Sequence, residues 1–266
     1  MIDKKTHPAV HRLVEAREGK GRPAALFVEG ARLVEELLSS GLRPTEFYFS
    51  AALRKPGPLL ARLEEAGARG DLLSPTVMEF VSDLEAPPGI VVLAPRPPDR
   101  WEEAIRAADM PLVVVLDGAQ SPSNAGAVVR AAEAAGATAV LQSTGGADLL
   151  GPKALRSSSG SAFRLPLGGG RSGPEWAEKL SAMGLEGVAA DAGEGTVHTS
   201  FDWTRPTALF LGGETGFSNE ALRALPKVRI PLRPPVESLN VAVAAGVLLF
   251  EANRRKIGLA NDSGRT

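Results

Sequence analysis

The sequence predicts an α/β protein with largely parallel sheets, divided into two domains. Short runs rich in Val, Ile, Leu and Phe alternate with helical patterns along the chain, which is the order expected when helices connect parallel strands. Several runs are apolar on both faces, as in strands that helices cover on each side. A proline-rich stretch from Pro95 to Arg100 interrupts the alternation. Because prolines stiffen the backbone and remove amide donors, we place a domain boundary there.

The first domain, residues 1–96, is predicted to be a small α/β sandwich. Runs rich in β-branched and aromatic residues are typical of strands, and here they cover residues 26–30, 46–50, 89–95 and, more weakly, 71–74. Amphipathic patterns predict helices over residues 31–40 and 58–67.

The second domain, residues 107–260, is predicted to hold the larger parallel sheet. Its strands are expected at residues 112–117, 137–143, 162–167, 185–192, 207–213 and 228–232, and a closing helix is expected from near Leu239. Ligands of such sheets bind beyond the carboxyl ends of the strands. We therefore expect a site at the loops that follow the first, the fifth and the last of these strands.

Composition excludes several kinds of chemistry. The chain of 266 residues has no cysteine, which excludes disulfides and thiol nucleophiles, and its three histidines form no ligand cluster, so we expect no metal site. The longest apolar run, from Val241 to Phe250, is too short to span a bilayer. The N-terminus lacks the apolar stretch of a secretory signal, so we expect a cytoplasmic protein without a membrane partner.

Charge is unevenly distributed, although the formal net charge is only −1. Residues 153–171 carry four cations and no acid, and residues 223–256 carry seven cations against two acids. Such clusters are typical of nucleic-acid-binding surfaces, but scattered surface arginines explain them equally well. Charge alone leaves both interpretations open.

The first segment with candidate chemistry runs from Leu116 to Gly136. A strand ends, a loop with glycine and proline follows, and a helix begins near Asn124, with Arg130 in its second turn. The two side chains are placed to bind a phosphate or a sugar. Alternatively, Asn124 only caps the helix and Arg130 pairs with Glu133. The glycines do not form the dinucleotide fingerprint, which disfavours a nicotinamide enzyme.

The second segment is a buried strand that opens into a glycine-rich loop. Gly212 and Gly213 let a ligand approach the backbone closely, and Glu214 is placed to orient a substrate or a partner arginine. By itself the pattern also fits an ordinary turn, with Ser218 capping the helix that follows.

The third segment leads into the closing helix. Ser238 is predicted to cap that helix, and Asn240 to lie in its first turn with its amide reaching out of the helix end. The helix is apolar on nearly every face, so it must be buried on all sides, either within one chain or against a second copy.

Taken in order, the three segments resemble the three motifs of the SpoU/TrmH family of RNA ribose methyltransferases, a branch of the SPOUT superfamily. The resemblance covers about Pro111 to Lys256, and the N-terminal part is similar to a ribosomal-protein-like substrate-binding domain. It implies a trefoil-knotted parallel-sheet domain, S-adenosyl-L-methionine as cofactor, and a homodimer whose active site uses both chains. The implied reaction is methyl transfer to a ribose 2′-hydroxyl of structured RNA, with rRNA favoured over tRNA by the added domain.

The resemblance also implies residue roles. The cofactor pocket would be formed by Leu211, Gly212, Gly213, Ile230, Leu232, Ser238 and Leu239. The polar catalytic positions would be Asn124, Arg130, Glu214, Ser238 and Asn240, and Arg156 is a candidate for binding RNA phosphate. The sequence departs from the family twice: Ser121-Pro122 replaces the usual Asp-Pro, and the loop after Glu214 is one residue shorter.

For the reaction we expect Arg130 to hold the hydroxyl oxygen rather than to act as a base, because a free guanidinium has a pKa above about 12. An RNA phosphate or Ser238 would then relay the proton. Two other classes remain open. One is a catalytically inactive RNA-binding or ribosome-assembly protein on the same scaffold, and the other is a Rossmann-type enzyme that uses a different nucleotide.

Overall fold

The structure is a computed structural model that describes residues 1–20, 25–54, 56–213, 216–217 and 219–263, with side chains up to Arg255. The chain forms two compact units: Met1–Pro98 with Leu150–Arg164, and Asp99–Leu149 with Leu165–Thr266. The change between Pro98 and Asp99 falls within the proline-rich stretch. Residues 150–164, which the sequence places in the second domain, belong to the first unit.

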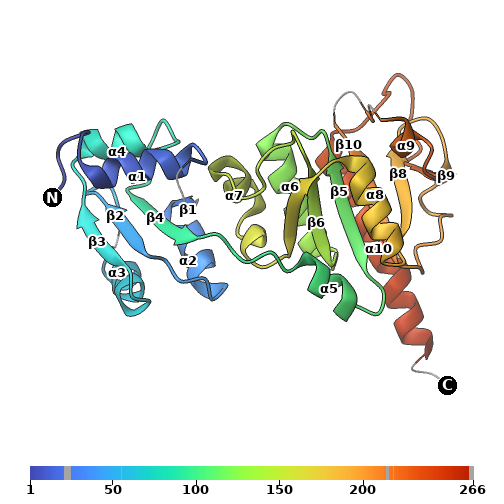
Figure 1. Cartoon of the computed structure of the whole chain (residues 1–266), viewed down its shortest axis with the longest axis horizontal. Coiled ribbons are helices and arrows are strands. Elements are labelled where there is room, and N and C mark those ends of the chain that lie inside the picture. The colour runs from blue at the N-terminus through green and yellow to red at the C-terminus, as the bar shows by residue number, and fades with distance from the viewer. Residues whose placement is uncertain (21–24, 55, 214–215, 218, 264–266) are drawn as a thin grey trace. The chain divides into compact units, whose positions relative to one another are not determined.

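The first unit contains a mixed sheet with the strand order β1-β4-β2-β3 (Figure 1). Strand β4 is antiparallel to both of its neighbours, whereas β2 and β3 are parallel to each other. The bounds of the strands are Ala25–Glu29 for β1, Glu46–Phe49 for β2, Arg69–Leu72 for β3 and Ile90–Pro95 for β4. All four predicted strands therefore form, but only part of this sheet is parallel.

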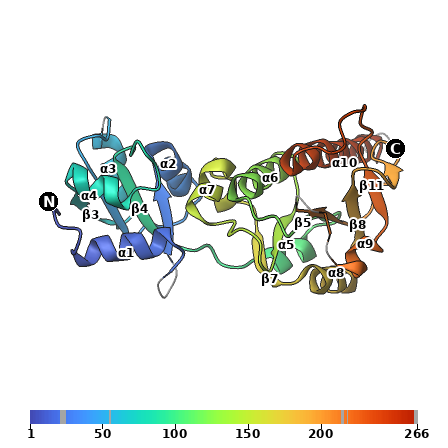
Figure 2. The same cartoon turned by 90° about the horizontal axis from the view of Figure 1, so that it is seen from above.

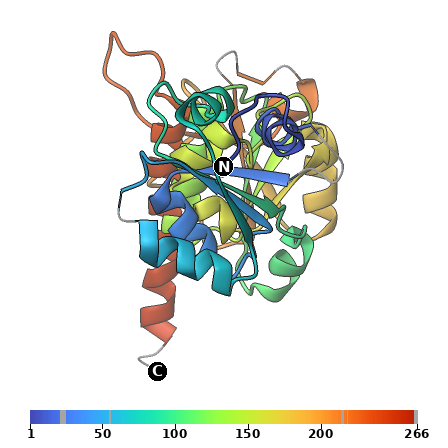
Figure 3. The same ribbon diagram turned by 90° about the vertical axis from the view of Figure 1, so that its left-hand side faces the viewer.

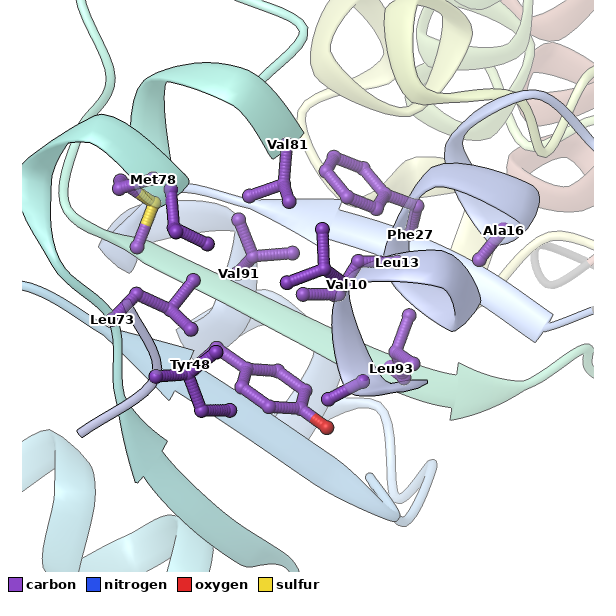
Figure 4. Packing of buried hydrophobic residues seen from close by; sticks show 13 residues of the cluster. Val10, Leu13, Ala16, Phe27, Tyr48, Leu73, Met78, Val81, Val91 and Leu93 are labelled. Carbon is purple, nitrogen blue, oxygen red and sulfur yellow. The ribbon is translucent and has the colours of Figure 1, made fainter. Parts of the chain in front are cut away.

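Helices cover both faces of this sheet (Figure 3). Helices α1 (Pro8–Arg17) and α4 (Pro75–Val81) lie on one face, and α2 (Ala31–Ser39) and α3 (Pro56–Glu65) on the other. The core under α1 and α4 is shown in Figure 4 and includes Val10, Leu13, Phe27, Met78 and Val91. The α/β sandwich predicted for the N-terminal part is thus present.

The second unit contains a sheet in which the paired strands are parallel throughout the described residues, in the order β7-β6-β5-β10-β8-β11-β9. The central strands β5 (Leu112–Asp117) and β10 (Thr207–Gly212) are buried except at their last residues. The bounds of the other strands are Ala139–Ser143 for β6, Leu167–Arg171 for β7, Glu186–Asp191 for β8, Thr196–Val197 for β9 and Lys227–Arg229 for β11.

Figure 2 shows how helices enclose this sheet. Helices α6 (Pro122–Ala134) and α10 (Val241–Ser263) pack together on one face. The opposite face is covered by α5 (Trp101–Ala107), α8 (Gly173–Ala182) and α9 (Glu220–Arg223). The strands that the sequence shows as apolar on both faces are therefore covered on both faces, as predicted.

The strand predicted at residues 162–167 does not form. Helix α7 (Pro152–Ser158) ends where Ser159 and Gly160 adopt positive φ angles of 49° and 89°, and the 3-10 turn η1 (Ser161–Phe163) follows. The apolar side chains of this stretch are buried in a turn rather than in a sheet, and β7 begins only at Leu167. The apolar residues Ala162, Phe163 and Leu165, which are buried around this turn, imitate the pattern of a strand.

Candidate functional site

A cavity of about 490 Å³ opens at the carboxyl ends of the central strands of the second unit. It is lined from all three sequence segments: by α6, by the end of β10, by the loop after β11 and by the start of α10. The residues predicted there that line it are Asn124, Leu211, Gly212, Gly213, Ile230, Leu232, Ser238, Leu239 and Asn240. Segments that are far apart in the sequence are thus brought together at one site.

Close backbone approach joins the loops after β5 and β10. The Gly213 N–H donates a hydrogen bond of 2.8 Å to the carbonyl oxygen of Asp117. A Cβ added to Gly213 would lie 2.5 Å from the carbonyl oxygen of Gly118, closer than real Cβ contacts. Glycine is therefore required at this position, because any side chain would push the two loops apart.

Two asparagines form the polar side of the cavity. The Asn240 side-chain amide donates a 3.1 Å hydrogen bond to Oδ1 of Asn124, and Oδ1 of Asn240 accepts one of 2.9 Å from the N–H of Ala242. Asn240 thus caps α10, in place of the predicted Ser238. Helix α6 begins at Pro122, whose fixed φ suits the first helical position, so Ser121 is its cap rather than Asn124.

The rest of the wall is largely apolar, with one carboxylate that the sequence analysis did not single out. Asp191 lies at the end of β8 and lines the cavity. Burial by itself raises the pKa of its carboxyl, but hydrogen bonds from the N–H groups of Glu194 and Gly193, with the charge of Lys227, bring that pKa below its usual range. The rule that ligands bind at carboxyl ends of strands, applied to residues 185–192, would have found it.

Arg130 is placed differently from the asparagines. Its side chain is exposed, it does not line the cavity, and no hydrogen bond or ion pair joins it to another residue that the structure describes. The predicted pair with Glu133 is not formed. Glu214, the remaining predicted polar position, lies outside the described residues.

Arg156 lies in the first unit and is engaged there. Its guanidinium is 2.5 Å from a carboxylate oxygen of Asp83 and 3.9 Å from one of Glu29. The Glu29 side chain is fully buried, whereas that of Arg156 is 24% exposed. The structure thus uses Arg156 to offset two carboxylates rather than leaving it free for an RNA phosphate.

One face of α10 remains uncovered in the single chain. Ala245, Leu248, Leu249 and Ala252 are buried, but Val243, Val247 and Phe250 are 53%, 37% and 52% exposed. The exposed residues are spaced four and three apart and share one helix face. Burial within one chain therefore accounts for only part of this apolar helix.

Neither a metal cluster nor a membrane-spanning helix is found among the residues that the structure describes. The cavity instead offers apolar walls, backbone groups of a glycine loop, neutral amides and the carboxylate of Asp191. These are the features of a site for an organic molecule, and about 490 Å³ lies in the usual range of roughly 300–1,000 Å³ for such sites. The fold and the site define an α/β protein that binds an organic ligand at the strand ends of a parallel sheet.

Comparison with known proteins identifies the family. The model of the SpoU rRNA Methylase family matches residues 111–250. The 23S rRNA (uridine(2479)-2'-O)-methyltransferase of Streptomyces viridochromogenes is 36% identical over 252 residues, covering 92% of this chain and 83% of the relative. The 23S rRNA (guanosine(2553)-2'-O)-methyltransferase RlmP of Bacillus subtilis is 29% identical over 239 residues, covering 89% and 92%.

Solved structures agree with the sequence matches. The SpoU methyltransferase AviRb from Streptomyces viridochromogenes, in complex with the cofactor AdoMet, is similar with a TM-score of 0.83 at 27% identity, covering 94% of this chain and 98% of that one. The chain belongs to the SpoU rRNA methylase family. The family predicted from the three motifs and the α/β fold class predicted from the alternating strand and helix patterns are thereby confirmed.

Proposed function

We propose that this chain transfers a methyl group from S-adenosyl-L-methionine to a ribose 2′-hydroxyl of structured RNA, with ribosomal RNA as the favoured substrate. The observation that carries the proposal is that three motif segments, separated by as many as about 90 residues, line one cavity in a member of this family. Relatives named as 23S rRNA 2′-O-methyltransferases support the reaction and the substrate class. The AdoMet complex of a solved relative supports the cofactor.

The backbone groups and apolar side chains that line the cavity suit this cofactor. Backbone groups at Leu211, Gly212 and Gly213 are suited to hydrogen-bond an adenine or ribose edge, and Ile230, Leu232 and Leu239 to pack on the base. Gly212 approaches Gly216 so closely that a Cβ on Gly212 would lie 3.0 Å from the Gly216 carbonyl carbon, so the backbones of these two glycines are in close contact. When bound, S-adenosyl-L-methionine supplies an electrophilic methyl group on a positively charged sulfur.

The chain itself must align the acceptor hydroxyl and provide a path for its proton. We assign to Arg130 the role of holding the hydroxyl oxygen and stabilising its developing negative charge. Ser238 lines the cavity and is exposed, so it is placed to relay the proton, as is a phosphate of the RNA. Asn124 and Asn240 position the acceptor, and Glu214 is assigned by motif position alone.

A homodimer explains why Arg130 lies outside the cavity of its own chain. The apolar stripe of α10, formed by Val243, Val247 and Phe250, is the surface through which a second copy would pack. In that dimer the cavity of one chain would receive Arg130 from the partner. One cause, the missing partner chain, then explains both why Arg130 is exposed and unpaired and why the apolar stripe of α10 is uncovered.

The reaction is tested by incubating the protein with methyl-labelled cofactor and protein-free ribosomal RNA from cells that lack it. Label is expected at a ribose 2′-oxygen, and Asn124→Ala should reduce incorporation by at least tenfold while the chain stays folded. Unlabelled RNA that nevertheless binds tightly would favour the catalytically inactive RNA-binding protein. Calorimetry with S-adenosylhomocysteine and NAD separates both from a Rossmann-type enzyme, because only the first compound is expected to bind.

The shared site is tested by mixing two variants at a cofactor concentration low enough that each alone has little activity. Chains with Arg130→Ala and chains with Gly213→Ala are combined to form mixed dimers. If Arg130 acts across the interface, one of the two sites in a mixed dimer has an intact cavity and an intact arginine, so activity should return. If all residues act within one chain, no site is complete and activity should stay absent.

The interface is tested by Val247→Glu, which should convert a dimer into a monomer in sedimentation analysis. Phe80→Glu, at an exposed apolar residue of α4 in the first unit, is the matched control and should leave the dimer intact. A dimer that persists in Val247→Glu would rule out this face. The trefoil knot, RNA binding by residues 1–96, independence from metal ions and a cytoplasmic location remain predictions.

A further inference from the structure

A second, smaller cavity of about 220 Å³ adjoins the first. Its lining comes from the loop after β5, the start of α6 and two residues of the larger cavity's wall: Gly118, Ala119, Gln120, Ser121, Asn124, Gly213 and Val241. Asn124, Gly213 and Val241 line both cavities. The two spaces therefore meet at a common wall.

The hydrogen bonds of the common wall fix the direction of the Asn124 amide. Oδ1 of Asn240 already accepts the hydrogen bond that caps α10. The NH2 group of Asn240 is therefore the group that faces Asn124. Asn124 must then present its oxygen to Asn240, and its own NH2 group is directed elsewhere. No hydrogen bond to a described residue is found for that NH2 group, so it offers its donors to a ligand oxygen at the junction of the two cavities.

The loop after β5, which lines the smaller cavity, is anchored at its backbone by two hydrogen bonds. The N–H of Gly118 donates a 3.1 Å hydrogen bond to Oγ of Ser143, and the carbonyl oxygen of Ala119 accepts one of 2.9 Å from Ala147. Gln120, between this anchored stretch and the Ser121 cap, is exposed and has no hydrogen bond within the described part of the chain. An anchored loop thus presents an amide that carries both donors and an acceptor.

The chemistry of the lining selects among ligands. Every described residue that lines the smaller cavity is neutral, which disfavours a phosphate group as its occupant. Its volume is below the roughly 300 Å³ typical of sites for whole small molecules. A sugar with part of its base matches both properties, and amide side chains are common partners of base edges.

We propose that the smaller cavity receives the ribose of the nucleotide to be methylated, with Asn124 donating to a ribose oxygen and Gln120 reading the edge of the base. The proposal rests on the proposed function, since it places the acceptor beside the larger cavity. It makes Gln120 a residue that determines which nucleotide is modified. Single-stranded or unstacked nucleotides are the natural substrates of such a site, because only their base edges are accessible.

The test compares Gln120→Ala and Gln120→Glu with the unchanged protein and with Ser123→Ala, a neighbouring residue that lines neither cavity. The substrate is protein-free ribosomal RNA from cells that lack the protein, and, once the methylated position is mapped, a short RNA with each of the four bases there. For Gln120→Ala, kcat/KM on the mapped base should fall about 5- to 100-fold, the size expected for a lost base contact. The discrimination among the four bases should also shrink in Gln120→Ala. Gln120→Glu retains only acceptors, so it should change the order in which the four bases are preferred.

Calorimetry with S-adenosylhomocysteine separates this subsite from the cofactor site. Affinity for that compound should stay within twofold in both Gln120 variants, and thermal unfolding should be unchanged. Weakened binding of S-adenosylhomocysteine would overturn the proposal and assign the smaller cavity to the tail of the cofactor. Unchanged base discrimination would also overturn it. If the unchanged protein methylates no RNA, the proposed function itself fails, which is a different result from either of these.

Discussion

The two arginines that the sequence singles out, one in each unit, are used in opposite ways. In the first unit Arg156 is paired with Asp83, as Arg12 is with Glu46 at 2.8 Å and Arg164 with Glu36 at 2.6 Å. In the second unit, the site is built from backbone groups and amides, and Arg130 has no partner among the described residues. A cluster of cations in a sequence therefore does not identify the functional arginine. Whether an arginine is paired with a carboxylate in the fold is more informative.

The sharpest test of this contrast is Arg130→Ala, for which we expect the largest effect. The loss of a group that stabilises developing charge typically lowers kcat by about 10²- to 10³-fold. Because Arg130 makes no interaction with the described residues, the free energy of unfolding should change by less than about 0.5 kcal/mol. Methyl transfer to ribosomal RNA and urea unfolding measure the two quantities. Arg106→Ala, an exposed arginine of α5, is the control, and equal rates in the two variants would contradict the assignment.

The role of Arg130 is sharpened further by Arg130→Lys. If the arginine acts as a base, the lysine variant should retain a rate that rises strongly with pH, because an amine titrates more readily than a guanidinium. If the arginine acts by its charge, as we expect, the residual rate should show no such dependence. The pH–rate profile of the variant distinguishes the two roles.

A smaller effect is expected from Gly213→Ala, which tests whether backbone approach builds the site. The added Cβ would meet the carbonyl oxygen of Gly118 at 2.5 Å, so the loops after β5 and β10 must separate. We expect the affinity for S-adenosylhomocysteine to fall by about tenfold or more, equivalent to about 1.4 kcal/mol. Gly57→Ala is the matched control, since its Cβ would meet nothing within 4 Å. Equal affinities in the two variants, measured by calorimetry, would show that the approach is not needed.

Buried strands and the residues around the cavity could be predicted from the sequence, whereas the pairing of distant residues could not. The buried strands β5, β6 and β10 lie within the predicted ranges, because their apolar runs must be covered on both faces. The residues around the cavity were predicted by motif order. The pairing of Arg156 was not predicted, since its partners Glu29 and Asp83 are more than 70 residues away in the sequence. Local patterns carry no information about such distant pairs.

The exact helix caps and one strand boundary also could not be predicted from the sequence. The sequence offered Ser238 and Asn124 as caps, but the choice between neighbouring capping residues depends on where the helix begins, which Pro122 decides for α6. In the same way, the apolar pattern of residues 162–167 does not reveal the turn at Ser159 and Gly160. These errors shift boundaries by a few residues but leave the fold unchanged.

The next effect in size is expected at the paired arginine, Arg156. Arg156→Ala leaves Glu29 buried without its cation, and we expect the first unit to lose about 1–3 kcal/mol of unfolding free energy, since Arg156 is itself partly exposed. Hydrogen exchange in β1 and α7 measures this loss. The three tryptophans all lie in the second unit, so their fluorescence reports that unit separately and should be unaffected. Arg32→Ala, at an exposed arginine of α2, is the control. A raised KM for RNA without faster exchange would instead make Arg156 an RNA contact.

The smallest effect is a pH dependence that arises from Glu29. Burial raises the pKa of its carboxyl above the usual value of 4.5, although Ser82 and the N–H of Asp83 donate hydrogen bonds to it and Arg156 is near. Between 4.5 and the raised value, the folded state binds more protons than the unfolded state, so the stability of the first unit should fall as the pH rises through this window. Glu29→Gln removes the titrating group, so the stability of the variant relative to the unchanged protein should improve over the same window.

Glu251 of α10 in the second unit provides the opposite case. Hydrogen bonds from Arg254, and then from Arg255, lower the pKa of its carboxyl to about 2 against the cost of burial. Its contribution to stability is therefore complete above pH 4.5 and is lost as the pH falls towards 2. Relative to the unchanged protein, Glu251→Gln should be less stable at neutral pH and should approach it in acid. Exchange in β1 and tryptophan fluorescence, followed from pH 3 to 7, give the two profiles separately. Parallel profiles for the two variants would contradict the view that Glu29 and Glu251 are held in opposite ways.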